Sequence, residues 1–201
     1  MRFCTITVSL VISLISSSHC ALTTETSLAD GIAPGGKQIF TVSTPFSSGG
    51  NLGGPAGADT ICQNDTYKPA RGTYKALLAS STRRACSTSN CSTANESLDW
   101  VLAPKTKYVQ KDSIKEIFTT NTNGIFIFGT MTNTFLATPS APAYTGLTAT
   151  WQTSANTCNS WTSSSGGVNG QMGNVDSTGS QAISSTTYDC SINLRLICVE
   201  Q

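Results

Sequence analysis

Histidine is nearly absent from this sequence. The 201 residues contain one, His19, and it lies in an N-terminal segment with the features of an export signal. Without an imidazole, the rest of the chain cannot form a Ser-His or Cys-His catalytic pair, because both need histidine as the base. Zinc is also disfavoured, since there is no Cys-x2-Cys pair and no histidine to complete a ligand set. We therefore expect no catalytic residues, no bound metal and no cofactor.

Charged residues are scarce as well. Asp, Glu, Lys and Arg make up 11% of the chain, well below the level of about a quarter that is typical of soluble proteins. Removing Arg2 with the N-terminal segment leaves equal numbers of basic and acidic residues. A nucleic-acid binder usually carries a basic surplus, so we expect no nucleic-acid partner. Serine and threonine dominate the polar residues, which suits broad hydrogen bonding more than the steering of charged partners.

Long hydrophobic runs are missing too. The only sustained one, Ile6–Ile15, is too short to cross a membrane and follows the positively charged Arg2, so it predicts a cleaved secretory signal over residues 1–20. Two alternatives stay open. One is an uncleaved anchor or a buried N-terminal helix, and the other is a lipid anchor on Cys20, which His19 fits poorly because a small residue is preferred there. We expect a secreted or cell-surface protein with no membrane span.

Six cysteines follow the predicted signal. They are Cys62, Cys86, Cys91, Cys158, Cys190 and Cys198. In an exported chain this even number predicts three disulfides, and the count alone leaves fifteen pairings open. Residues 21–201 are enough for a sizeable core, so the bridges would add to hydrophobic packing without having to replace it.

Composition divides the exported part in two. Residues 21–36 are rich in Thr, Ser, Gly and Pro and predict a flexible tether, and residues 37–201 predict one domain. Periodicity predicts strands at 37–42, 72–79, 105–109, 124–129 and 190–199, and a short helix at 56–64. Residues 113–118 fit either a helical turn or a strand. Residues 131–150 and 163–187 are expected to form loops.

Parts of the domain resemble endostatin, the C-terminal domain of certain collagens. Residues 41–62 contain a Thr-Pro turn, a glycine-rich loop and a Gly-Ala-Asp-x-x-Cys motif, and residues 72–80 look like the endostatin segment that follows. The C-terminal third is similar again, with a Cys-x-x-Trp motif at 158–161, then Cys190 and the run at 196–200. The chain looks closer still to bacterial secreted proteins of uncharacterised function that carry an endostatin-like domain.

This resemblance implies an α+β, C-type-lectin-like fold that is loop-rich and disulfide-bonded, with its first and last strands paired. It also implies the disulfide pairs Cys62–Cys198 and Cys158–Cys190, which leaves Cys86–Cys91. No metal is carried over. Endostatin binds zinc largely through histidines near its N-terminus, which this chain lacks, and the motifs of calcium-dependent sugar-binding lectins are absent.

A dibasic pair, Arg83 and Arg84, is the first candidate for ligand binding. It lies beside the loop between Cys86 and Cys91, where guanidinium groups could contact sulfate or carboxylate groups. A solvated pair of surface charges is the simpler interpretation.

The three tryptophans are the second set of candidates. Trp100 lies in the part of the chain that least matches endostatin, and we predict it as a surface residue that stacks on a sugar. Trp151 and Trp161 flank Cys158, so they are expected to pack around its disulfide in the core.

Acidic residues offer two further alternatives. Asp112 and Glu116 would share one face of a helix and could hydrolyse a glycoside, but neighbouring lysines favour a charge-paired, solvated face. Asn174, Asp176 and Asp189 carry oxygen ligands of the kind that calcium prefers, although turn residues are the simpler interpretation.

Taken together, these patterns favour a non-catalytic binding module of the adhesin type that recognises an extracellular matrix protein or a glycan. Part of this prediction rests on similarity of fold, which is a weak guide to function. Two alternatives remain: a small secreted hydrolase that uses carboxylates, and a structural protein of the cell envelope. The sequence leaves the ligand and the oligomeric state open.

Overall fold

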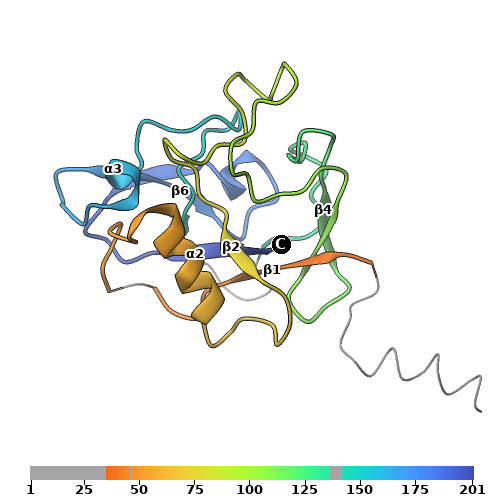
Figure 1. The fold of residues 1–201 in the computed structure, drawn as a ribbon, viewed down its shortest axis with the longest axis horizontal. Helices are drawn as coiled ribbons and strands as arrows, with labels where there is room; N and C mark the ends of the chain where they lie inside the picture. Colours follow the sequence, from red (N-terminus) through yellow and green to blue (C-terminus); the bar gives the residue numbers. More distant parts are fainter. Residues whose placement is uncertain (1–34, 46, 136–141) are drawn as a thin grey trace, which may run out of the picture. The chain divides into compact units, whose positions relative to one another are not determined.

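A mixed β-sheet of eight strands organises the domain (Figure 1). Its strands are β1 (Lys37–Thr41), β2 (Tyr74–Ala76), β3 (Lys107–Gln110), β4 (Glu116–Thr119), β5 (Pro142–Tyr144), β6 (Asn169–Asn174), β7 (Thr186–Asp189) and β8 (Arg195–Glu200). The order across the sheet is β4-β3-β1-β8-β5-β6-β7, and β2 also pairs with β8.

The structure is a computed structural model that describes residues 35–45, 47–135 and 142–201. The predicted signal at 1–20 and most of the predicted tether lie outside the described residues. Gly35–Gln201 forms one compact unit.

Strand β8 lies at the centre of the sheet, because it pairs with three other strands. It runs antiparallel to β1, with Val199 opposite Ile39. Its other edge pairs antiparallel with β2, where Glu200 is opposite Tyr74, and parallel with β5 nearer its start. The first and last strands are therefore paired, which the resemblance to endostatin also implied.

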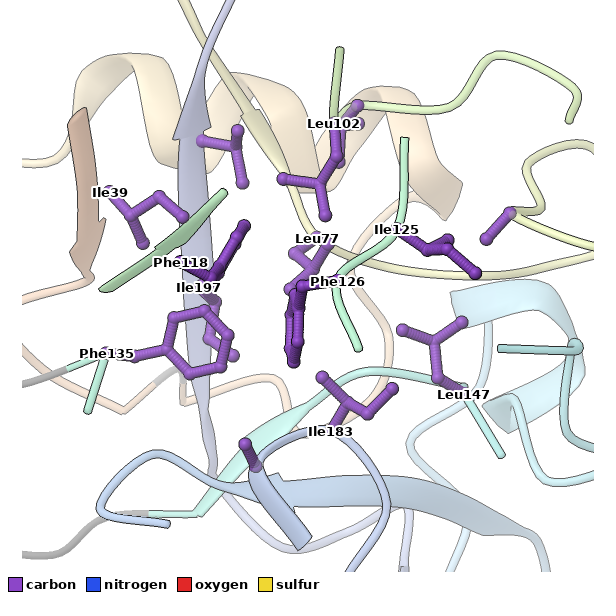
Figure 2. Close-up of a cluster of buried hydrophobic side chains, with 14 of the residues drawn as sticks. Ile39, Leu77, Leu102, Phe118, Ile125, Phe126, Phe135, Leu147, Ile183 and Ile197 are labelled. Carbon is purple, nitrogen blue, oxygen red and sulfur yellow. The ribbon is translucent and has the colours of Figure 1, made fainter. Parts of the chain in front are cut away.

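Both faces of these central strands are buried. Successive side chains of a strand point to opposite faces, and in β1 both Ile39 and Phe40 are almost completely buried. Ile39 belongs to a first core that is rich in aromatic rings, in which Phe118 stacks on Phe126 and Phe135 packs edge-on against Phe118 (Figure 2). Phe40 belongs to a second core on the other face.

Helix α2 (Gly54–Asn64) covers the second core and is the main helix of the domain. Pro55 lies in its first turn, where the missing N–H is not needed and the fixed φ suits the helix. Ala58 and Cys62, four residues apart, form its buried face. The sequence prediction of a helix at 56–64 is therefore confirmed. The other helical segments are short: α3 (Cys158–Trp161) and the 3₁₀ turn η1 (Ser180–Ala182).

The expected α+β, C-type-lectin-like fold is wrong. Helices account for only about 11% of the structure, and the eight-stranded mixed sheet dominates. The error arose where the sequence at 131–150 and 163–187 predicted loops, because these segments contain β5, β6 and part of β7. The Pro of β5 and the Gly and Asn residues of β6 have weak strand preference, and tertiary pairing overrides that preference.

The apolar run at 124–129 is also not the buried strand that its composition predicted. Ile125 and Phe126 are buried, but Ile127 is 64% exposed. The chain turns at this point, where Thr130 donates its backbone N–H to the carbonyl of Ile127. The undecided segment at 113–118 contains the start of β4, a strand.

Three disulfides cross-link the domain. The pairs are Cys62–Cys198, Cys86–Cys91 and Cys158–Cys190. The resemblance to endostatin implied Cys62–Cys198 and Cys158–Cys190 and left Cys86–Cys91 as the remaining pair. Together the bridges indicate an oxidising, extracellular environment. Over the residues that the structure describes, no helix has the length and apolar character needed to cross a membrane.

Candidate functional site

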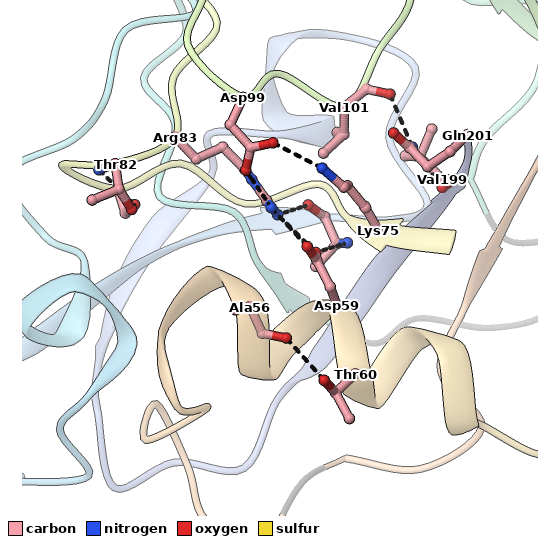
Figure 3. Close-up of polar contacts among 12 residues, drawn as sticks. Ala56, Asp59, Thr60, Lys75, Thr82, Arg83, Asp99, Val101, Val199 and Gln201 are labelled. Carbon is pink, nitrogen blue, oxygen red and sulfur yellow. Dashed lines mark hydrogen bonds and ion pairs between the residues drawn. The ribbon is translucent and has the colours of Figure 1, made fainter. Parts of the chain in front are cut away.

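Arg83 is buried, which corrects its prediction as a surface ligand residue. Its side chain is only 2% exposed, and its guanidinium is fully occupied by two carboxylates (Figure 3). Both terminal nitrogens donate to Asp59 at 2.7 Å, one to each carboxylate oxygen. Nε and Nη2 donate to Asp99 at 2.9 and 2.7 Å. Arg83 therefore has a structural role and offers nothing to an external ligand.

The ion pairs of Arg83 tie three segments together. Burial alone would lower the pKa of Arg83, but the hydrogen bonds and charges of Asp59 and Asp99 outweigh it and raise the pKa above its usual value. Asp59 comes from α2 and also accepts the backbone N–H of Ala76 in β2. Lys75 donates to the other oxygen of Asp99 at 2.8 Å. The loop that begins at Arg83 is thus fixed to the sheet and to α2.

Glu96 organises the next part of this loop, around the Cys86–Cys91 disulfide. The residue is 5% exposed. Its carboxylate accepts hydrogen bonds at 2.6–3.1 Å from backbone and hydroxyl groups of Ser87, Thr88 and Thr93. The hydroxyl of Thr88 contributes most, and together these donors hold the pKa of Glu96 far below its usual range. The loop therefore folds around a carboxylate that is negatively charged at neutral pH.

Replacing Glu96 with Gln is expected to destabilise the protein at neutral pH and to have less effect in acid. A carboxyl group whose pKa is lowered by folding stabilises the fold above its unfolded pKa of about 4.3, and this contribution is lost as the pH falls toward the folded pKa. The Glu96→Gln variant lacks this stabilisation at every pH, and the wild-type protein loses it only in acid. Urea midpoints measured from about pH 8 to about pH 3 should therefore converge. A constant difference across that range would contradict the role of the charge.

Arg84 differs from its neighbour because it is anchored but not neutralised. Its backbone exchanges two hydrogen bonds with Leu98, both 3.0 Å long, and its Nε donates to the carbonyl of Glu96 at 3.0 Å. Its two terminal nitrogens have no acceptor among the residues described. Arg84 thus presents two N–H₂ groups on a fixed stem, the geometry that suits a carboxylate or a sulfate.

Arg84 lines a polar pocket of about 300 Å³, which we name the Arg84 pocket. Its lining residues are Ser80, Ser81, Arg84, Cys86, Ser87, Gln152 and Thr153. One wall is formed by residues 80–87 and the other by Gln152 and Thr153. Gln152 connects them, since it forms a backbone bridge with Cys86 and donates from its side chain to the carbonyl of Ser87 at 3.1 Å. The hydroxyl oxygen of Thr153 is buried and has no hydrogen-bond partner in the described part of the chain.

A strained turn adjoins the pocket. All four residues of α3 have φ between 48° and 66°, so α3 is a turn of left-handed helix. This conformation costs roughly 1–2 kcal/mol per residue and persists only where the surroundings enforce it. Here the Cys158–Cys190 disulfide and the buried Trp161, which donates to the carbonyl of Ala79, hold it in place. The hydroxyl of Ser160 in α3 lies 3.0 Å from that of Ser81 in the pocket wall.

The chain matches a known protein family over most of its length. Residues 45–178 match DUF1554, a family described as protein of unknown function. The chain belongs to the DUF1554 family. The matched region contains every residue of the Arg84 pocket and ends before β7 and β8. A search of the curated proteins found no match.

Elsewhere in this DUF1554 domain, the tryptophans have structural roles. Trp100 is not a free surface ring: it is partly buried, donates from its indole to the carbonyl of Gly124 at 2.9 Å and packs edge-on against Trp151. Trp151 and Trp161 are buried, as predicted. Only Trp161 shares a core with Cys158, because Trp151 packs in the first core.

The oxygen atoms considered for calcium do not come together. Asp189 pairs with Asn169 at one end of β6, and Asn174 lies at the other end. Five residues of strand separate the two ends by roughly 17 Å. Asp176 lies two residues beyond Asn174, past the end of β6. Among the described residues, no group of three His, Cys, Asp or Glu is placed to hold a metal ion.

The Arg84 pocket shows what the sequence could and could not reveal. The dibasic sequence predicted Arg84 as a ligand-binding residue, but it gave the same prediction for Arg83, which is buried. Gln152 and Thr153 were missed, because they lie more than sixty residues away and join the pocket only through the bridge to Cys86. No local motif marks such a contribution.

Proposed function

We propose that this DUF1554 protein is a non-catalytic binding module of the adhesin type, secreted or displayed at the cell surface, that recognises a matrix protein or a glycan through the Arg84 pocket. The observation that carries the proposal is Arg84 itself, whose two terminal guanidinium nitrogens are unused by the described part of the chain and sit on a fixed stem. Planar guanidinium groups bind carboxylates and sulfates in a bidentate manner. Such groups are common on extracellular glycans and on acidic side chains.

The lining of the pocket supports a sugar or a polar side chain as the bound group. Around Arg84, three serine hydroxyls, a threonine hydroxyl and an amide face a small volume. These groups donate and accept hydrogen bonds, which suits the alternating donors and acceptors of a saccharide. The pocket is also preformed, because the disulfide, Glu96 and the ion pairs of Arg83 fix its walls. A preformed site loses little conformational entropy on binding.

The carboxyl groups favour binding over hydrolysis. A glycosidase needs a carboxylic acid with a raised pKa that can donate a proton. Among the described residues, the two carboxyl groups whose pKa is shifted are Glu96 and Asp99, and both are lowered. At Asp99 burial alone would raise the pKa, but the hydrogen bonds from Lys75 and Arg83 outweigh it. Asp112 and Glu116 do not share a helix face, since one lies in a turn beside its partner Lys111 and the other begins β4. Over the described ranges, the geometry of these carboxyl groups therefore gives the alternative of a carboxylate-based hydrolase no support.

Export and ancestry belong to the same proposal. We propose that residues 1–20 act as a cleaved signal without lipid on Cys20. We also propose that the chain is related to the bacterial secreted proteins that resemble endostatin in sequence. The pairs Cys62–Cys198 and Cys158–Cys190 support this relationship, because they are the two that the resemblance implied.

Arg84→Gln provides the test. We expect the oxidised protein to bind saturably to one or more members of an array of matrix proteins and acidic glycans, and added salt to weaken that binding. Losing two charge-assisted hydrogen bonds should lower the affinity of Arg84→Gln by about tenfold or more. Lys105→Gln is the matched control, because it removes one positive charge from an exposed residue outside the pocket.

Two results would count against the proposal. Binding that survives Arg84→Gln unchanged would exclude the Arg84 pocket as the site. A blank array would remove the support for an adhesin and favour the remaining alternative, a structural protein of the envelope.

A further inference from the structure

A buried hydroxyl without a partner marks a second pocket. Thr41, at the end of β1, is 1% exposed, and its Oγ1 has no hydrogen-bond partner among the residues described. Buried polar groups in folded proteins are nearly always paired, so such an exception calls for an explanation. Thr41 lines a pocket of about 250 Å³, which we name the Thr41 pocket. A molecule that enters this pocket can supply the missing partner.

The wall of the Thr41 pocket is apolar beside that hydroxyl. Ile39 lies two residues before Thr41 in β1 and therefore points to the same face. Phe135, 2% exposed, completes the apolar wall. The volume lies below the range of about 300–1,000 Å³ that is usual for drug-sized ligands. The pocket thus fits a small molecule with an apolar part.

Its rim carries a positive charge that no carboxylate of the described residues neutralises. Lys111 and Lys115, from the turn between β3 and β4, both line the pocket. The ammonium of Lys111 is occupied, since it pairs with Asp112 and lies 4.4 Å above the ring of Tyr67. Lys115 is exposed and has no carboxylate partner within the described ranges. An anion is therefore the complementary ligand for this rim.

The turn that carries the two lysines is held in place. Lys111 donates its backbone N–H to the carbonyl of Ile39 at 2.9 Å, and Gln110 donates its backbone N–H to the carbonyl of Lys115 at 2.9 Å. The side-chain amide of Gln110, which is 7% exposed, also donates to the carbonyl of Thr134. Lys115 is thus tied through Gln110 to β3, and the turn is tied through Lys111 to β1, the strand that supplies Thr41. The pocket therefore exists before any ligand binds.

We propose that the Thr41 pocket binds a small carboxylic acid with an apolar body. The carboxylate pairs with Lys115, the apolar body packs against Ile39 and Phe135, and the ligand completes the hydrogen bonding of the Thr41 hydroxyl. The Thr41 pocket and the Arg84 pocket share no lining residue. The second site is therefore independent of the proposed glycan or matrix ligand.

Calorimetric titration of the oxidised full-length protein tests this site. The probes are benzoate, 4-hydroxybenzoate and hexanoate, each compared with its uncharged amide. We expect at least one acid to bind at least about tenfold more tightly than its amide. Lys115→Gln should remove that preference, and Lys105→Gln, an exposed lysine outside the pocket, should keep it. Equal binding of acids and amides, or no binding of any probe, would overturn the proposal.

The variant Thr41→Val tests whether the Thr41 hydroxyl binds a ligand or stabilises the fold. Valine keeps the shape of threonine and removes the unpartnered hydroxyl, so the free protein should unfold at an unchanged or higher temperature. The same variant should bind the preferred acid severalfold more weakly than wild type. A free Thr41→Val protein that unfolds at a clearly lower temperature would show that the hydroxyl already has a partner inside the fold. Unchanged acid binding would likewise contradict its role.

Discussion

Replacing Arg83 with Met should lower the free energy of unfolding by about 2–4 kcal/mol, whereas the same change at Arg84 should cost less than about 1 kcal/mol. Arg83 is buried between Asp59 and Asp99, and its removal leaves two carboxylates without their cation. Breaking a fully buried pair costs about 3–5 kcal/mol. The expected range is lower because Asp59 and Asp99 are 20% and 44% exposed and water can partly solvate them.

The two arginines form a matched pair of substitutions. They are adjacent in sequence and lose the same charge and the same length of side chain, so the difference between the variants reports burial and pairing alone. Urea unfolding of the oxidised proteins measures it. Asp59→Asn in the Arg83→Met background should then add little, because its partner is already gone. Equal losses at Arg83 and Arg84 would refute the structural assignment of Arg83.

The contrast between these neighbours shows why the site was only partly predictable. A dibasic pair looks the same in sequence whichever side chain turns inward. The direction of Arg83 depends on Asp59, which lies 24 residues earlier on a helix, and on Asp99, which follows 16 residues later. Neither acid stands out as a partner from local spacing. The sequence therefore indicated a basic position but could not tell the structural arginine from the accessible one.

The fold was also only partly predictable. Local sequence pattern predicted some elements, whereas others depend on contacts that form only in the folded chain. Alternating apolar residues predicted β1, and α2 was predicted from its apolar spacing. The glycines of β6 led to the wrong prediction of a loop, because glycine usually weakens a strand. Here Gly170 and Gly173 allow close approach: a Cβ would lie 2.7 Å from the ring of Tyr144 and 2.1 Å from the carbonyl of Ala182, respectively. Glycine in a strand can mark such a contact, but only the folded chain shows with what.

Removing the Cys62–Cys198 disulfide by double substitution to Ala should lower the free energy of unfolding by about 5 kcal/mol in the chain-entropy account. The two cysteines are 136 residues apart, so the bridge restricts most of the unfolded domain. The same substitution of Cys86 and Cys91, five residues apart, should cost only about 2 kcal/mol, because a short loop loses little entropy on closure.

The comparison between the two double variants is more informative than either value. Both remove the same atoms from buried positions, since all four cysteines are at most 6% exposed. Losses caused by lost packing should therefore be similar in the two variants, and the excess for Cys62–Cys198 reports the length of the closed loop. Guanidinium unfolding of both proteins gives that excess. Equal losses would show that packing, and not the restriction of the unfolded chain, determines what these disulfides contribute.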